Sequence, residues 1–245
     1  MLDIQKIKRI IAHLRVKKLP QDIYIEQLRS LVTGEGMLHA GTPYLINHAI
    51  KNMPVGGTVI EIGSYGGLST NLILYLLKKN NRDEKLFNCD PWIYGGQKES
   101  YTDTSNIDGS DDITCADFSK YVKESFIRST KFLNSNNLPH SFHLTSDDFF
   151  EKYKQNLNEK DLFGTEVQLG EPISFAYIDG NHAYDFAKRD FENVDKFLKK
   201  SGFILFDDSV DGSYFGSAKF MKEMKKNPNY KFILKNPNYL FQKIV

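Results

Sequence analysis

Residues 1–52 carry the hydrophobic spacing of helices. Four apolar side chains recur at the i, i+3, i+4 and i+7 positions of one helical face: Ile7, Ile10, Ile11 and Leu14. Pro20 interrupts this pattern, and a second helix is predicted over residues 22–31. A third helix is expected to begin at Thr42, an N-cap residue followed by a proline, and to run to about Lys51. This segment is therefore predicted to be a helical extension.

From residue 58 onwards, short apolar runs alternate with helical patterns. Five runs predict β-strands, at residues 58–62, 85–89, 141–144, 173–178 and 203–206. Helices are predicted at residues 69–79 and 218–226. A further long helix is predicted from an apolar stripe that ends at Lys199–Gly202 and consists of Ala187, Phe191, Val194 and Leu198. Residues 230–234 and 239–245 flank Asn236-Pro237-Asn238, which predicts a terminal hairpin.

This order of elements predicts an α/β fold. Strands that alternate with helices form a doubly wound, mostly parallel sheet, here of seven strands, to which the final hairpin adds an antiparallel edge. Residues 53–245 are expected to form the main domain. Residues 94–137 do not fit the repeat, because they are first polar and then helical. A long insert between strands is often a lid or a substrate-recognition element.

Composition narrows the class of protein. The chain has 245 residues with 32 basic and 31 acidic side chains, and the net charge of +1 excludes a globally basic nucleic-acid binder but leaves a local basic patch open. No apolar run approaches ~18 residues, so no membrane span is expected. The start of the chain lacks the pattern of a signal peptide. Two cysteines, Cys89 and Cys115, are too few for a disulfide scaffold. These features predict a cytoplasmic protein.

The first predicted helix has a basic polar face, with Lys6, Lys8, Arg9, Arg15, Lys17 and Lys18 near or on it. Such a helix is compatible with a membrane surface. The alternative, which we favour, is that its apolar stripe packs on the core or on a second subunit. An exposed apolar stripe therefore suggests a homodimer formed through the N-terminal helices.

A glycine-rich turn follows the first strand of the main domain, in the sequence Val59-Ile60-Glu61-Ile62-Gly63-Ser64-Tyr65-Gly66-Gly67-Leu68-Ser69-Thr70. Such a turn lets a ligand approach the backbone, and the helix that begins there offers free N–H groups. Tyr65 occupies the place of the second glycine of the dinucleotide fingerprint, which disfavours pyrophosphate binding. The turn alone is also compatible with a site that binds no ligand.

Asp90 ends the second strand of this domain. An acid at this position can accept hydrogen bonds from both ribose hydroxyls of a nucleoside, and the nearby Trp92 could stack on a ring. Ser146 and Asp147, after the third strand, lie where an adenine edge would be read. Asp90 before a proline is also a common turn former. Together, the turn and the acid point to a cofactor that contains a nucleoside.

Carboxylates also follow two neighbouring strands. Asp179-Gly180-Asn181-His182 follows the strand at 173–178, and Asp207-Asp208 follows the strand at 203–206. Three carboxylates at the same sheet edge would repel one another without a cation, and hard oxygen ligands suit Mg²⁺ or another divalent ion. The alternative is that Asp207 and Asp208 cap a turn while Asp179 binds the backbone.

Taken in order, these motifs resemble class I S-adenosylmethionine-dependent methyltransferases. The most similar branch includes macrocin-type sugar and natural-product O-methyltransferases, and the resemblance extends from Gly56 to the C-terminus. It implies a Rossmann-like methyltransferase domain at 53–245, with S-adenosylmethionine as cofactor. The residues that it implies around the cofactor are Glu61, Gly63, Ser64, Tyr65, Gly67, Ser69, Asp90, Trp92, Ser146, Asp147 and Asp179.

The resemblance also implies a catalytic centre. Asp179, Asp207 and Asp208 match the positions that bind the metal, and Asp179 with His182 would be catalytic. In the catechol enzymes a lysine three residues after the first metal aspartate is the general base, and here this position is His182. In some sugar-modifying relatives an aspartate two residues after it is the proposed base, and here this position is Asn181, which cannot take a proton.

The resulting hypothesis is methyl transfer to a hydroxyl of a small molecule, a sugar or a polyhydroxylated natural product, with the help of a divalent metal. Two alternatives remain from the sequence. The first is a methyltransferase that acts without metal, and the second is a nucleotide-binding or hydroxylase-like protein on the same fold.

Overall fold

The computed structural model describes residues 4–17, 25, 38–93 and 113–245 of the chain. Most of the helix predicted at 22–31, and the polar first part of the insert, lie outside these residues. Within them, a seven-stranded sheet has the order β3-β2-β1-β6-β7-β9-β8. Its strands are β1 Thr58–Ile62, β2 Leu86–Cys89, β3 His140–Phe142, β6 Ile173–Ile178, β7 Leu198–Phe206, β8 Tyr230–Lys235 and β9 Tyr239–Lys243.

The predicted fold class is confirmed. Strands β3, β2, β1, β6 and β7 pair in parallel, whereas β9 pairs antiparallel with both β7 and β8. The chain leaves β1 towards β2 and β3 on one side, and it leaves β6 towards β7 on the other. The order therefore reverses between β1 and β6, and in such sheets ligands bind beyond the carboxyl ends of the strands at this point.

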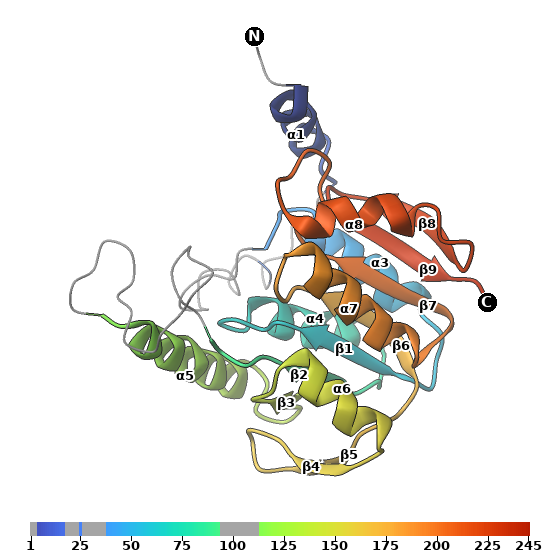
Figure 1. Cartoon of the computed structure of the whole chain (residues 1–245). Coiled ribbons are helices and arrows are strands. Elements are labelled where there is room, and N and C mark those ends of the chain that lie inside the picture. The colour runs from blue at the N-terminus through green and yellow to red at the C-terminus, as the bar shows by residue number, and fades with distance from the viewer. Residues whose placement is uncertain (1–3, 18–24, 26–37, 94–112) are drawn as a thin grey trace.

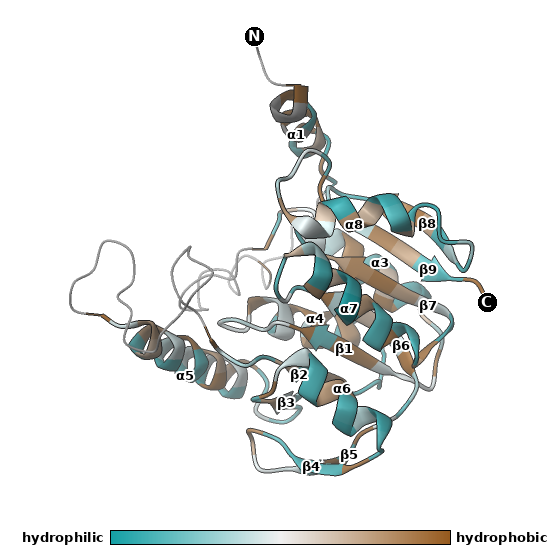
Figure 2. Cartoon of the chain, in the orientation of Figure 1, coloured by the Kyte–Doolittle hydropathy of each residue, from teal (hydrophilic) through white to brown (hydrophobic). Residues whose placement is uncertain are grey.

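Helices cover both faces of the sheet (Figure 1). Helices α3 (Thr42–Asn52) and α4 (Leu68–Lys79) share one hydrophobic core with one face. Helices α6 (Ser146–Lys154), α7 (Tyr184–Asp195) and α8 (Gly216–Met224) share the other. Figure 2 shows apolar central strands and polar outer surfaces on α6 and α7. This three-layer arrangement explains why all five residues of β1 are buried.

Two further helices lie at the periphery. Helix α5 (Cys115–Leu133) begins with a capping box between Thr114 and Asp117, and it forms the described part of the predicted insert. Helix α1 (Ile4–Leu14) projects beyond α8 (Figure 1), and its stripe of Ile7, Ile11 and Leu14 is exposed. The homodimer expected from this stripe stays a prediction. Among the described residues, no helix is both long and apolar enough to cross a bilayer.

One predicted helix boundary is wrong. The helical pattern was expected to end at Lys199–Gly202, but α7 ends at Asp195 and β7 begins at Leu198. Leu198 pairs with Ile173 of β6, and the register shifts within this pairing before it resumes at Phe203. An irregular strand start can keep helix-like apolar spacing, so the pattern favoured a longer helix than tertiary pairing allows.

Several elements were not predicted. Helix α6 follows Thr145, whose hydroxyl accepts a hydrogen bond from the Asp148 amide, and it buries Phe149, Phe150 and Tyr153. A small antiparallel ribbon of β4 (Asn158–Lys160) and β5 (Glu166–Gln168) follows it.

The third predicted helix starts at Thr42, but its N-cap is Gly41, one residue earlier than expected.

Candidate active site

The residues that follow the central strands form one row at the carboxyl edge of the sheet. The backbone hydrogen bonds between neighbouring strands continue for one residue past the strand ends. The amide of Gly63 donates to the carbonyl of Cys89 at 3.0 Å, and the amide of Asp179 donates to the carbonyl of Ile62 at 2.8 Å. The amide of Asp207 donates to Ile178 at 2.9 Å in the same way. The backbone therefore fixes these side chains at the point where the strand order reverses.

A cavity of about 450 Å³ opens at this edge. It is lined by five residues predicted for the cofactor, namely Gly63, Ser64, Tyr65, Ser69 and Asp90, and by the predicted metal ligands Asp179, Asp207 and Asp208. This volume is in the range of small-molecule sites, about 300–1,000 Å³. The structure thus brings the two predicted groups of residues into one space.

The turn after β1 depends on glycine at two positions. Gly63 has φ +85°, and a Cβ there would lie 2.1 Å from the carbonyl oxygen of Asp179. Gly67 has φ +92°, and a Cβ there would lie 3.0 Å from Phe126 of α5. Both backbones are in the left-handed region that favours glycine. Gly63 is required by the close approach of β1 and β6, and Gly67 by the packing of α5.

Asp90 fixes the shape of this turn. Its Oδ2 accepts hydrogen bonds from the amides of Ser64 at 2.8 Å and Tyr65 at 2.9 Å, and its Oδ1 accepts one from the Trp92 amide at 2.6 Å. Asp90 is 3% exposed and still lines the cavity. Backbone amides therefore use three of the four lone pairs of the Asp90 carboxylate, which holds the turn in place at the cavity.

Glu61 is the buried acid below the turn. Its Oε2 accepts hydrogen bonds from Thr70 at 2.5 Å, and from Ser64 and Asn88 at 3.2 Å each. Its Oε1 is buried without a hydrogen-bond partner among the described residues. Burial raises the pKa of Glu61 to about 7, although the hydrogen bonds oppose this rise.

Five residues predicted around the cofactor do not line the cavity: Glu61 and Gly67, which belong to the turn and the strand before it, and Trp92, Ser146 and Asp147. The Trp92 ring packs on Phe126 with centroids 5.1 Å apart, and its Nε1 donates to the carbonyl of Tyr65 at 3.0 Å. Ser146 donates to Asp190 at 2.5 Å, and Asp147 pairs with Arg189 at 3.0 Å. As far as the described residues define the cavity, none of these five residues is part of its lining.

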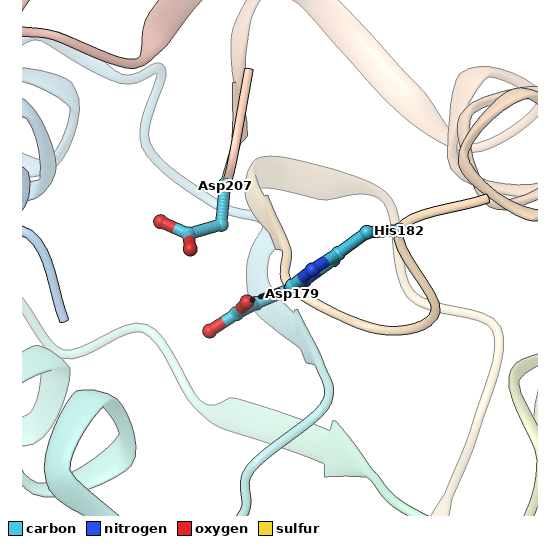
Figure 3. A group of neighbouring side chains, drawn as sticks. All are labelled: Asp179, His182 and Asp207. Carbon is cyan, nitrogen blue, oxygen red and sulfur yellow. Dashed lines mark hydrogen bonds and ion pairs between the residues drawn. The ribbon is translucent and has the colours of Figure 1, made fainter. Parts of the chain in front are cut away.

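Asp179, His182 and Asp207 converge beside the cavity (Figure 3). Each offers one ligand atom, and these atoms lie within 4.8 Å of one another. The His182 ring lies between two carboxylates, with Nε2 3.3 Å from Asp179 Oδ1 and Nδ1 2.9 Å from Asp208 Oδ2. Asp207 instead accepts a hydrogen bond from Asn238 at 2.7 Å.

Burial and charge shift the protonation of this cluster. Burial alone would lower the pKa of His182, but Asp179 and Asp208 outweigh it and raise that pKa to about 10. Burial and the neighbouring carboxylates raise the pKa of Asp207 well above its usual value. In the absence of another cation, His182 is therefore the positive charge that offsets these acids, and it is not a free base.

The donor set fits a divalent cation. Asp179 and Asp207 line the cavity with His182 beside them, and hard oxygen donors suit Mg²⁺ or Mn²⁺. Asp208 is not in this close group, and its predicted role as a metal ligand stays a prediction. Asp208 has a left-handed backbone with φ +46° and faces His182 and His39.

Sequence reasoning missed His39. It lines the cavity, and its Nε2 lies 3.3 Å from Asp208 Oδ1. It comes from the segment before α3, outside the region that resembled known enzymes, and no motif surrounds it. Phe215 was missed as well, because no motif marks it, although it lines the cavity and its ring lies 5.0 Å from that of His182.

The sequence model of a family described as a methyltransferase domain matches residues 60–209. This match covers more than half of the chain and includes the glycine-rich turn, Asp90 and the acidic cluster. The chain therefore belongs to the methyltransferase domain family, as its motifs predicted.

A relative in Acanthamoeba polyphaga mimivirus, the uncharacterized protein R132, is 24% identical over 169 residues. The match covers 69% of this chain and 58% of that protein, less than two thirds of its length.

Two solved structures share the fold. One is the O-methyltransferase TomG from Streptomyces achromogenes, involved in tomaymycin synthesis and determined in complex with S-adenosylmethionine. It is 12% identical with a TM-score of 0.55, and the alignment covers 98% of this chain and 96% of TomG. The other is CalS11, a TDP-rhamnose 3'-O-methyltransferase of calicheamicin biosynthesis, at 14% identity and a TM-score of 0.53, covering 93% and 96%. At these identities the likeness shows the fold alone, which this chain shares with TomG and CalS11.

Proposed function

We propose that this protein transfers the methyl group of S-adenosylmethionine to a hydroxyl of a small molecule, a sugar or another polyhydroxylated compound. The observation that carries the proposal is the cavity that the glycine-rich turn and Asp90 share with Asp179 and Asp207, the two carboxylates that His182 accompanies. One group suits a nucleoside cofactor, and the other suits the activation of a hydroxyl. Both TomG and CalS11 are O-methyltransferases of natural-product pathways, which supports this choice of acceptor.

The cofactor would be held by the turn after β1. Asp90 would accept a hydrogen bond from a ribose hydroxyl, and Gly63, which lines the cavity, would present its backbone to the cofactor. Glu61 is buried beneath the turn and does not line the cavity, and its Oε1 has no hydrogen-bond partner among the described residues. When ionised, it would stabilise the cationic methionine part through its charge. Ser69, at the start of α4, lines the same space.

The transfer itself is a direct displacement. The acceptor oxygen forms a bond to the methyl carbon while the bond from that carbon to sulfur breaks, and the hydroxyl proton leaves to a base. A divalent ion, when bound at Asp179 and Asp207, would lower the pKa of the hydroxyl and fix its position. His182 is the proposed base, and it can take the proton only when it is neutral. Its contacts with Asp179 and Asp208 raise the pKa of His182, so this role requires that the bound acceptor or cation weaken those contacts.

The production of S-adenosylhomocysteine tests this function. The protein is incubated with S-adenosylmethionine and a panel of sugars and phenols, in the presence of Mg²⁺ or after treatment with a chelator. Product that depends on a hydroxyl acceptor supports the proposal. Unchanged turnover after chelation would leave methyl transfer in place and remove the metal, which is the second hypothesis. Binding of nucleotides without binding of S-adenosylmethionine would support the third.

A further inference from the structure

A second and larger cavity of about 1000 Å³ lies between α1, α8 and the loop that follows Asp208. Its floor includes residues 211–214 and the hairpin turn at Asn236 and Pro237. Figure 1 shows α1 above α8 on this side of the molecule. The volume is at the upper end of the range for small-molecule sites, about 300–1,000 Å³. We refer to it as the basic cleft.

The basic cleft is lined by six cationic side chains and one carboxylate. The cations are Lys8, Arg15, Lys219, Lys222, Lys225 and Lys235, and the carboxylate is Asp211. Asp211 pairs with Lys235 at 2.5 Å and lies 3.8 Å from Lys225. It accepts a further hydrogen bond from Tyr239 at 2.6 Å. The only acid among the described lining residues is therefore already engaged.

Four of these cations have no acidic partner among the described residues. Lys8 of α1, Arg15 just beyond α1, and Lys219 and Lys222 of α8 lie within ion-pair distance of no carboxylate in this part of the chain. Like charges that face one another across a concave surface repel, and a bound anion relieves this repulsion. The whole chain has a net charge of only +1, so the excess of positive charge is local to the cleft.

The cleft is held together by specific contacts. The amide of Lys17, beyond the end of α1, donates to Asn236 Oδ1 at 2.6 Å, and Asn236 Nδ2 donates back to the Lys17 carbonyl at 2.6 Å. Asn236 is buried and also donates to the carbonyl of Gly41 at 3.1 Å. The β8–β9 turn therefore holds the end of α1 beside α8.

The basic cleft adjoins the candidate active site through one short loop. Tyr214 lines the cleft, and the next residue, Phe215, lines the cavity at the strand ends. The two rings lie 4.2 Å apart, and the Phe215 ring is 5.0 Å from that of His182. Consecutive residues of one loop thus line the two spaces.

We propose that the basic cleft binds the phosphate or diphosphate group of a phosphorylated acceptor while the hydroxyl to be methylated enters the active site. The proposal names the substrate class of the proposed methyl transfer and rests on that function. The acceptor would then be a sugar or other polyhydroxylated unit that carries a phosphate or diphosphate group, for example a nucleoside diphosphate sugar. Lysine and arginine bind such groups through charge and multiple N–H donors.

Binding of inorganic pyrophosphate, measured by calorimetry, tests the cleft without an identified acceptor. The double variant Lys219→Glu/Lys222→Glu should bind pyrophosphate at least about tenfold more weakly than the wild type, since it replaces two attractive charges by repulsive ones. Lys219→Arg/Lys222→Arg should restore binding. Lys78→Glu/Lys154→Glu is the matched control, because both lysines are exposed in the last turn of other helices.

Titration of S-adenosylhomocysteine into the same variants separates the two proposals. Unchanged binding of S-adenosylhomocysteine in Lys219→Glu/Lys222→Glu, with pyrophosphate binding lost, supports the cleft as a separate site. Equal pyrophosphate affinity in all four proteins, or no binding by the wild type, would overturn the cleft proposal. Neither result bears on the proposed methyl transfer, which is contradicted instead if S-adenosylhomocysteine does not bind to the wild type.

A comparison of acceptors tests the chemistry further. Uridine diphosphate should compete with pyrophosphate, whereas uridine should not. Uridine diphosphate sugars should be methylated with a KM at least about tenfold below that of the free sugars, and the charge-reversed variant should raise this KM with little change in kcat. Equal KM values for both acceptor forms would contradict the proposal. Binding to phosphatidylserine vesicles without competition by pyrophosphate would instead assign the cleft to a membrane.

Discussion

Replacing Glu61 by glutamine should make the protein more stable and less able to bind its cofactor. The carboxyl is fully buried, and its Oε2 accepts all three hydrogen bonds from Thr70, Ser64 and Asn88. A glutamine carbonyl oxygen can take this place. The amide nitrogen then occupies the position of Oε1, which has no partner among the described residues. The substitution therefore removes a charge and keeps the shape.

The size of the effect follows from the pKa of Glu61. A rise from 4.5 in the unfolded chain to about 7 in the folded protein means that ionised Glu61 destabilises the fold by about 3 kcal/mol. The folded state holds the Glu61 proton more tightly than the unfolded chain does. The stability that protonated Glu61 contributes is therefore complete below pH 4.5 and is lost as the pH rises through about 7. The glutamine side chain of the variant does not titrate. Relative to the wild type, Glu61→Gln should gain about 2 to 3 kcal/mol between about pH 5 and pH 8.

Thermal and urea unfolding at about pH 5 and pH 8 measure this difference. A gain of this size corresponds to a rise in Tm of about 5–10 °C for a chain of this length. Glu192→Gln removes a carboxyl from the exposed surface of α7 and is the control. Calorimetry at about pH 8 should show S-adenosylmethionine binding to Glu61→Gln about tenfold more weakly than to the wild type. The reasoning is refuted if the stability difference does not grow with pH.

Further substitutions test the other parts of the site. Gly63→Ala should lower the free energy of unfolding, measured by urea titration, by more than about 3 kcal/mol. The alanine Cβ would collide with the Asp179 carbonyl, and the backbone φ of +85° disfavours alanine. A free energy of unfolding within about 1 kcal/mol of the wild type would contradict this prediction. Asp90→Asn should cost about 2 kcal/mol, since one acceptor oxygen is lost under three amide donors, and calorimetry should show weaker cofactor binding as well. Asp179→Ala should reduce Mg²⁺-dependent turnover far more than S-adenosylmethionine affinity, and equal losses in both would argue against a separate role in metal binding.

The sequence predicted the fold well because its signals are local. Apolar runs at 58–62 and 173–178 marked buried parallel strands, and the hairpin around Pro237 was correctly placed. The end of α7 was misplaced, since Leu198 continues the helical stripe yet pairs with Ile173. Here a long-range pairing overrides a local pattern, and no local rule could reveal it.

The site was predicted where a strand end carries its own residues. Gly63, Asp90, Asp179 and Asp207 each follow a strand, so the parallel register alone brings them together. Contacts between distant segments could not be predicted. His39 reaches Asp208 from 169 residues away in the chain.

The basic cleft is a contact of the same kind. It combines α1 with α8 and a hairpin turn that lie far later in the chain, as the Lys17–Asn236 separation of 219 residues shows. The basic face of the first helix was visible in the sequence, but the cations that oppose it were not.

Calorimetric titration of S-adenosylmethionine into the wild-type protein and Asp90→Ala tests the central claim most directly. The wild type should bind one molecule per chain with a sub-millimolar Kd, and Asp90→Ala should bind it at least about tenfold more weakly. Asp83→Ala, which removes an acid on the loop between α4 and β2, away from the cavity, should bind like the wild type. Absence of saturable binding by the wild type, or equal affinity in all three proteins, would contradict the assignment of this cavity to the methyl donor.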